Sequence, residues 1–138
     1  MSLVLDSSAM LALLRDEDGA DRVQNLLDDA DVPKFAHAVN LCEVFYDALK
    51  STDVTGAEVS MAALRDEGIV ERNDMDAAFW RDVATLIAQQ RAAGHRLALG
   101  DAFGVALARR EDADFVTADR AELESMQAAG IARITFIR

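Results

Sequence analysis

"MSLVLDSSAMLALL" (residues 1–14) holds a single charged side chain, Asp6, among apolar and small residues. The apolar residues ahead of Asp6 predict a short, buried β-strand. Residues 7–17 have the pattern of a helix, with Ser7 or Ser8 as its expected N-cap. A strand that passes directly into a helix is the unit from which helix-covered parallel sheets are built. A buried carboxylate at this junction needs a capping role or a cation to offset its charge.

The same alternation of short apolar runs and amphipathic segments continues along the chain. We expect strands over 2–6, 33–38, 69–73, 114–119 and 131–138, and further helices over 19–30, 40–51, 56–68, 74–94, 100–111 and 120–130. This order predicts an α/β fold in one domain, residues 1–138, with a mostly parallel central sheet of about four to five strands between helices. Ligands of such sheets bind beyond the carboxyl ends of the strands, where Asp6 and Asp119 are both expected.

Composition narrows the class of protein. The 138 residues are 51% hydrophobic, with 25 acidic against 14 basic side chains and a formal net charge of −11. This balance argues against a broad basic face that wraps nucleic acid. The single cysteine, Cys42, excludes an internal disulfide and is expected to be a small core residue. We find no signal-peptide pattern and no apolar stretch of about 18 residues, so we expect a cytoplasmic protein without a membrane span.

Acidic residues stand alone in apolar surroundings at three places along the chain. Asp6 is the first, Glu43 lies in "FAHAVNLCEVFY" (35–46), and Asp101 lies in "LALGDAFGVALA" (97–108). Two carboxylates about 4 Å apart repel by roughly 4 kcal/mol at an effective dielectric constant near 20. If these acids meet, with Asp119 at the end of its strand, a divalent cation is the natural partner, because hard cations prefer oxygen ligands.

Each of these acids also has an ordinary structural interpretation. Asp6, Asp101 and Asp119 all stand where a carboxylate can cap the helix that follows. Glu43 shares a helix face with Asn40, which is typical of a solvated surface. The functional interpretation therefore depends on the four acids taken together.

Four stretches carry a family resemblance by their order: "VLDSSAMLALL", "AVNLCEVFYDAL", "LALGDAFGVALA" and "FVTADRAEL". Together they resemble the PIN domain family, and within it the VapC-type toxins of prokaryotic toxin–antitoxin pairs. The resemblance runs from Leu3 to the end of the chain. It implies the PIN-like three-layer fold and a metal-dependent ribonuclease that hydrolyses RNA phosphodiester bonds.

The resemblance also implies roles for particular residues and partners. One or two Mg²⁺ or Mn²⁺ ions would be surrounded by Asp6, Glu43, Asp101 and Asp119. Water and ligands would be oriented by Ser7, Ser8 and Thr117. The family resemblance further implies a homodimer, a small antitoxin partner and an RNA substrate. Candidate phosphate contacts are Arg15, Arg120 and the pair Arg109–Arg110.

Two other functions remain open from the residues alone. An aspartyl nucleophile at Asp6 would transfer a phosphoryl group, but such sites have a second Asp two residues on, where this chain has Ser8, and a lysine at a strand end. A non-catalytic module would instead use the acidic pocket to bind an arginine-bearing partner peptide.

Overall fold

Five strands form one sheet in the order β3-β2-β1-β4-β5, and all four pairings are parallel. The computed structural model describes residues 1–138. The strands are β1 (Leu3–Leu5), β2 (Lys34–His37), β3 (Ile69–Arg72), β4 (Asp114–Thr117) and β5 (Ile134–Phe136). The predicted α/β fold is confirmed, and the sheet contains parallel pairs only.

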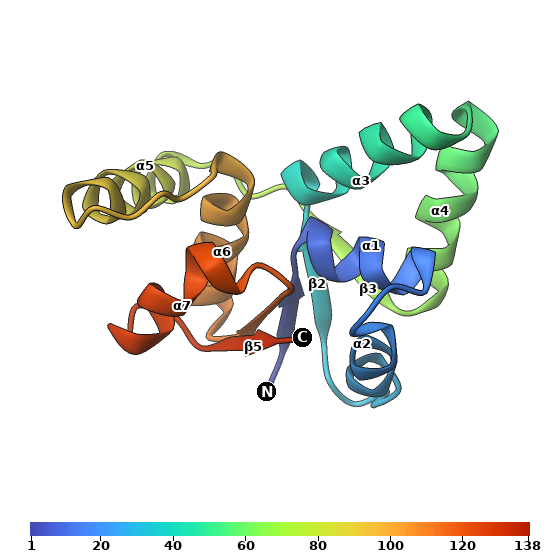
Figure 1. Cartoon of the computed structure of the whole chain (residues 1–138), viewed down its shortest axis with the longest axis horizontal. Helices are drawn as coiled ribbons and strands as arrows, with labels where there is room; N and C mark the ends of the chain where they lie inside the picture. The colour runs from blue at the N-terminus through green and yellow to red at the C-terminus, as the bar shows by residue number, and fades with distance from the viewer.

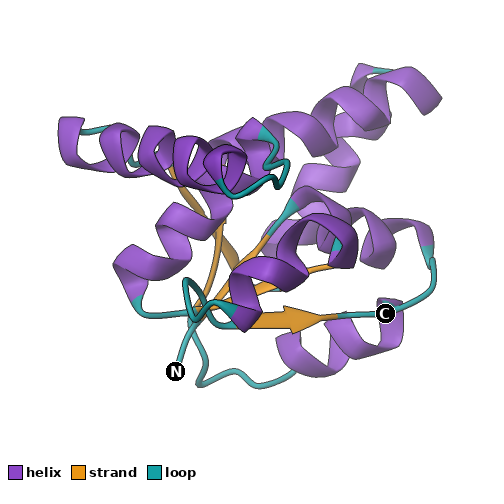
Figure 2. Cartoon of the chain, turned by 60° about the vertical axis from the view of Figure 1, so that its left-hand side comes forward, coloured by secondary structure: helices purple, strands orange, loops and turns teal.

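Helices cover both faces of this sheet (Figures 1 and 2). They are α1 (Ser7–Arg15), α2 (Ala20–Leu27), α3 (Ala38–Ser51), α4 (Val54–Asp66), α5 (Ala77–Ala92), α6 (Leu99–Glu111) and α7 (Arg120–Ala128). In Figure 1, α5, α6 and α7 lie on one side of the strands, and α1 to α4 lie on the other. None of the helices is both long and apolar enough to cross a membrane.

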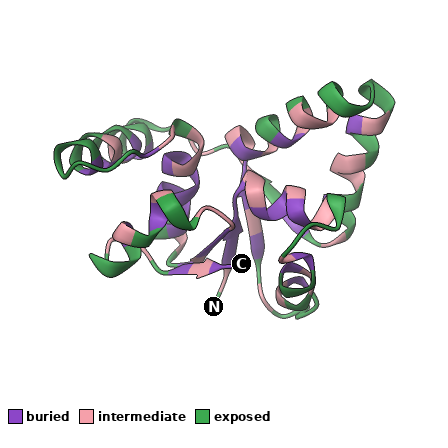
Figure 3. Cartoon of the chain, in the orientation of Figure 1, coloured by how far each residue is buried: buried purple, intermediate pink, exposed green.

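Alternating side chains of β1 divide the core into two halves. Leu3 and Leu5 pack into the cluster formed with α1, α2 and α4, whereas Val4 packs into the cluster formed with α5, α6 and α7. All three are at most 1% exposed, because β1 is the central strand and is covered on both faces. Figure 3 shows this burial concentrated on the strands and on α6, while α4 and α5 carry exposed outer faces.

The order in which strands are added to the sheet reverses direction at β1. β2 and β3 extend from β1 on one side, and β4 and β5 extend from it on the other. Because the strands are parallel, β1 and β4 end side by side, with Leu5 paired to Val116. This is the switch point at which open α/β sheets bind ligands.

Two local expectations about helix starts are corrected. The N-cap of α1 is Asp6 rather than a serine, since Asp6 is the single residue between the end of β1 and the start of the helix at Ser7. α6 begins at Leu99 and has Ala98 as its N-cap, so Asp101 lies inside the first turn. Asp101 therefore makes no capping bond, and another interaction must account for its carboxylate.

The expectation that Cys42 belongs to the core is wrong. Cys42 is exposed, because the fully buried positions of α3 are Asn40 and Val44. These two residues are four apart and define the inner line of the helix, and Cys42 falls between them on the outer side.

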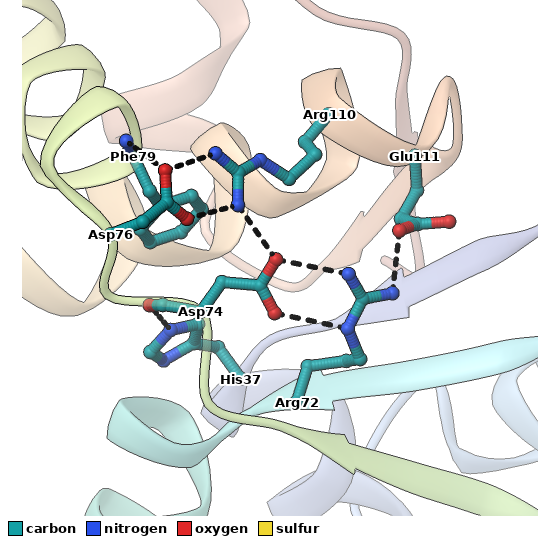
Figure 4. A network of polar contacts seen from close by, with 7 residues as sticks. All are labelled: His37, Arg72, Asp74, Asp76, Phe79, Arg110 and Glu111. Atoms are coloured by element: carbon teal, nitrogen blue, oxygen red, sulfur yellow. Dashed lines mark hydrogen bonds and ion pairs between the residues drawn. The ribbon is translucent and has the colours of Figure 1, made fainter.

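Charged side chains fasten the end of β3 to α6 (Figure 4). Arg72 donates to Asp74 at 2.9 Å and to Glu111 at 2.5 Å. Arg110 donates to Asp74 at 3.0 Å and to Asp76, the N-cap of α5, at 2.6 Å. The hydrogen bond from Arg72 holds the pKa of Asp74 below its usual range. The network fixes the helix that carries Asp101 relative to the sheet.

Candidate active site

Asp6 follows β1 directly and is almost completely buried, with 1% of its surface exposed. Its Oδ1 accepts hydrogen bonds from the Ser8 hydroxyl at 2.7 Å and from the Ala9 amide at 2.9 Å. Its Oδ2 accepts one from the Thr117 hydroxyl at 2.5 Å. Burial raises the pKa of Asp6 to about 6, although these hydrogen bonds favour the charged form. Asp6 is therefore both the cap of α1 and a carboxylate with a fixed orientation.

Two hydroxyl groups join the ends of β1 and β4. Thr117 is fully buried, and its hydroxyl oxygen accepts a hydrogen bond from the Asp119 amide at 3.0 Å. The Ser8 hydroxyl oxygen accepts one from the Ala118 amide at 2.9 Å. Ser7, by contrast, is half-buried and its hydroxyl has no hydrogen-bond partner in the protein. Of the three predicted orienting residues, Ser8 and Thr117 contact the site through hydrogen bonds.

Asp101 meets the other carboxylates from the first turn of α6. Burial is the main cause that raises its pKa, to about 9, followed by the negative charge of Asp6. A hydrogen bond with Glu122 and the charge of Asp119 act in the same direction. The residue is half-buried, so its charge is poorly solvated as well as repelled. Such a carboxyl group stays protonated near neutral pH unless positive charge enters the site.

A third carboxylate comes from the start of α7. Asp119 is the N-cap of this helix and accepts a hydrogen bond from the Glu122 amide at 3.1 Å. Asp101, Asp119 and Glu122 each offer one carboxylate oxygen, and these oxygens lie within 4.8 Å of one another. Three acids from two segments are thus close enough to share one cation.

Glu122 was not among the predicted site residues. The sequence signal was present, because a glutamate three residues after a capping Asp matches the spacing of a capping box. An acid in the first turn of a helix is also favoured by the helix dipole. The sequence therefore explains Glu122 as an ordinary helix-start residue and does not point to a place in the carboxylate cluster. Only the packing of α7 beside α6 shows that Glu122 faces Asp101.

Glu43 is exposed on α3 and lies against the start of α6. Asn40 donates to Glu43 Oε1 at 3.1 Å and to the Gly100 carbonyl at 3.0 Å, so it joins the two helices. A Cβ at Gly100 would lie 2.9 Å from Glu43 Cδ, so a larger residue here would displace this carboxylate from its position. Asn40 is fully buried and its Oδ1 has no partner. The structure therefore places Glu43 beside the residue that precedes Asp101.

The chemistry of these side chains fits a divalent cation. Every candidate ligand is a carboxylate oxygen, the donor that Mg²⁺ and Mn²⁺ prefer. The pKa of Asp101 is raised first by burial and then by the negative charges of Asp6, Asp119 and Glu122. One ion pair reaches the cluster, from Arg96 Nε to Glu122 Oε1 at 3.4 Å. A dication would relieve the remaining repulsion.

The arginines suggested as phosphate contacts are engaged elsewhere. Arg15 pairs with Asp47. Arg120 lies over the Phe136 ring, 4.3 Å from its centroid, and pairs with Glu124 at 3.7 Å. Both guanidinium groups are therefore already engaged in contacts within the protein. RNA contact by either residue stays a prediction.

The chain matches a known protein family in sequence. The sequence model of the PIN domain matches residues 3–128. None of the curated proteins matches the chain in sequence.

Solved structures share the fold at low sequence identity. VapBC-1 from nontypeable Haemophilus influenzae aligns with a TM-score of 0.74 and 14% identity, over 99% of this chain and 98% of that one. VapBC2 from Rickettsia felis, bound to a promoter DNA fragment, aligns with a TM-score of 0.77 and 14% identity over the same shares. VapC20 from Mycobacterium tuberculosis, described as a sarcin–ricin loop cleaving toxin, gives 0.69 and 16%, over 94% and 95%.

Proposed function

The chain belongs to the PIN domain family, and from this premise we propose that it is a metal-dependent ribonuclease that hydrolyses RNA phosphodiester bonds. The observation that carries the proposal is the meeting of carboxylates from distant segments where β1 and β4 end, namely Asp6, Asp101, Asp119 and Glu122. The fold shared with VapC20, described as a sarcin–ricin loop cleaving toxin, supports RNA as the substrate.

The acids at this edge of the sheet would hold Mg²⁺ or Mn²⁺, as one or two ions. Asp101, Asp119 and Glu122 would supply the ligands that share a cation, and Asp6 and Glu43 would complete the site directly or through water. When bound, such an ion polarises a phosphoryl oxygen and lowers the pKa of a bound water.

Hydrogen bonds within the protein orient the carboxylate oxygens of this site. Ser8 and Thr117 fix the orientation of Asp6, so its carboxylate does not have to reorganise during the reaction. Burial, with a contribution from the hydrogen bond to Glu122, raises the pKa of Asp101. A cation at the cluster would lower that pKa, so the proton would pass to solvent and both carboxylates would be available as ligands.

The proposed function also implies protein partners for this chain. Several structures with this fold are toxin–antitoxin complexes, which supports a small antitoxin protein as the partner that silences this chain. We also propose that the chain forms a homodimer. Large apolar side chains are exposed on its surface, including Tyr46 on α3 and Trp80 on α5, and dimerisation would remove such groups from water.

The test is cleavage of a labelled single-stranded RNA by the purified protein in Mg²⁺, in Mn²⁺ and in EDTA. We expect cleavage only with metal. Asp6→Asn and Asp101→Asn should each lower the rate by about 100-fold or more, since even outer partners of metal ligands cost roughly 10- to 100-fold. Asp82→Asn on α5, an acid paired only with Arg109, is the matched control and should cleave normally. Metal-independent cleavage, or full activity in both site variants, would overturn the proposal.

One observation favours a second candidate function, a pocket that binds an arginine-bearing peptide without catalysis. Glu122 already accepts a guanidinium, that of Arg96. Calorimetry with an arginine-containing peptide and with Mg²⁺ distinguishes the two functions. Peptide binding with no metal binding at millimolar concentration would favour the binding module. An aspartyl nucleophile has less support, because both oxygens of Asp6 are occupied by hydrogen bonds and Lys34 stands at the opposite end of the sheet.

A further inference from the structure

The loop between α5 and α6 is fastened to the acidic site at two points. Glu122 Oε1 lies 3.4 Å from Arg96 Nε, and Glu122 Oε2 accepts a hydrogen bond from the Ala98 amide at 3.2 Å. Both oxygens of a single carboxylate therefore hold this loop. Since Glu122 also meets Asp101, the loop brings the Arg96 guanidinium to the edge of the carboxylate cluster.

The guanidinium of Arg96 is available to a ligand. The side chain is 84% exposed, and its one ion pair uses Nε, which leaves both terminal nitrogens unpaired. Two parallel N–H groups on a planar fork match two oxygens of a phosphate. The ion pair at Nε places the guanidinium beside the acids of the site.

No other arginine in the structure combines these two properties. Among the ion pairs, only Arg96–Glu122 joins a guanidinium to an acid of the site. Arg15 and Arg120 pair with Asp47 and Glu124 instead. With a net charge of −11, the protein repels a polyanion overall, so an exposed guanidinium beside the site has a large effect on RNA approach.

We propose that Arg96 binds a phosphate of the RNA backbone next to the bond that is cleaved and so positions the substrate. This role rests on the proposed ribonuclease function. Arg96 would supply binding and register, whereas the carboxylate cluster would supply the chemistry. Removing the guanidinium should therefore raise KM much more than it lowers kcat.

Steady-state cleavage of a single-stranded RNA oligonucleotide at several salt concentrations tests this role. For Arg96→Ala we expect KM to rise about 10-fold and kcat to stay within about 3-fold. The slope of log(kcat/KM) against log[salt] should become shallower by about 0.7, the value for one lost phosphate contact on a single strand. Arg96→Lys should restore the salt slope but recover KM only in part, because it keeps the charge and loses the fork.

Arg133→Ala is the matched control. Arg133 precedes β5 and pairs with Asp114 at 2.8 Å, at the start of β4 and so at the end of the sheet opposite Asp119. It should keep the parent KM and salt slope. A normal KM and slope in Arg96→Ala, or an equal loss in Arg133→Ala, would overturn the role of Arg96 while leaving the ribonuclease function intact. Absence of RNA cleavage by the unmodified protein would instead overturn the ribonuclease function itself, and the role of Arg96 with it.

Discussion

At the scale of single residues, two glycines on α6 show how close packing builds the site. A Cβ at Gly100 would meet the flexible end of Glu43, whereas a Cβ at Gly104 would lie 2.8 Å from Cζ of the Phe115 ring. Glu43 is exposed and its side chain can swing away, but Phe115 is fully buried and cannot. Gly100 therefore leaves space for the Glu43 carboxylate, whereas Gly104 leaves space for the Phe115 ring in the core.

Gly100→Ala should separate activity from stability. The added methyl displaces the Glu43 carboxylate, and we expect RNA cleavage to fall about 10- to 100-fold, as for small misplacements of catalytic groups. The free energy of unfolding should hold or rise slightly, because alanine is favoured over glycine in a helix by about 1 kcal/mol. Denaturant titration and cleavage rates measure the two effects.

Gly104→Ala provides the contrast. It should lower the free energy of unfolding by about 1–3 kcal/mol through overpacking against Phe115. If Gly100→Ala loses stability to the same extent, or retains full activity, then the glycine does not make room for Glu43 in the way described.

At the scale of elements, α3 owes its starting point to a buried histidine. His37 Nδ1 accepts a hydrogen bond from the Val39 amide at 3.0 Å, which caps the helix that carries Glu43. Its Nε2 lies 2.9 Å from the carbonyl oxygen of Asp74, to which it donates. The ring also stacks on Phe79, with centroids 5.3 Å apart. One side chain thus joins β2, α3 and the start of α5 (Figure 4).

His37→Ala should destabilise the protein by about 2–4 kcal/mol, because it removes a helix cap and leaves a cavity beside Phe79. Chemical denaturation measures the change. His95, the only other histidine, is exposed in the loop before α6, so His95→Ala should leave stability within about 0.5 kcal/mol. Equal effects of the two substitutions would contradict a structural role specific to His37.

At the scale of the whole molecule, folding brings together negative charges that the unfolded chain keeps apart. The folded protein raises the pKa of Asp6 from 3.8 to about 6, mainly by burial, and that of Asp101 to about 9. Both shifts disfavour the charged form in the folded state. Stability from these groups is therefore fully present below about pH 4 and is lost as the pH rises through 6 and toward 9.

Thermal unfolding in EDTA and in Mg²⁺, measured from acidic to alkaline pH, checks this. In EDTA the stability should fall with rising pH, and the Asp6 shift alone corresponds to roughly 3 kcal/mol. Millimolar Mg²⁺ should restore the loss at high pH and have little effect near pH 4, where the ligands are protonated. Asp101→Asn should flatten the profile in EDTA, whereas Asp82→Asn should not. A profile that ignores Mg²⁺ would contradict a cation site among these acids.

Local patterns along the chain are enough to predict the elements and to single out three of the four acids that cluster in the structure. Short apolar runs and helical spacing predict every strand and helix to within a few residues of its observed bounds, because strands buried on both faces and helices buried on one face have different patterns. Asp6, Asp101 and Asp119 were visible as charges in apolar surroundings or at the end of a strand.

Which of these side chains meet depends on how the strands and helices pack together. The order β3-β2-β1-β4-β5 sets β4 beside β1 and so brings residues 6 and 119 together, and no local pattern specifies that neighbour. Glu122 and Arg96 carried ordinary surface signals, because an acid at a helix start and a loop arginine are common in any protein. Side-chain spacing reports which face of an element is buried, whereas the direction of a polar group toward another depends on the packing of whole layers.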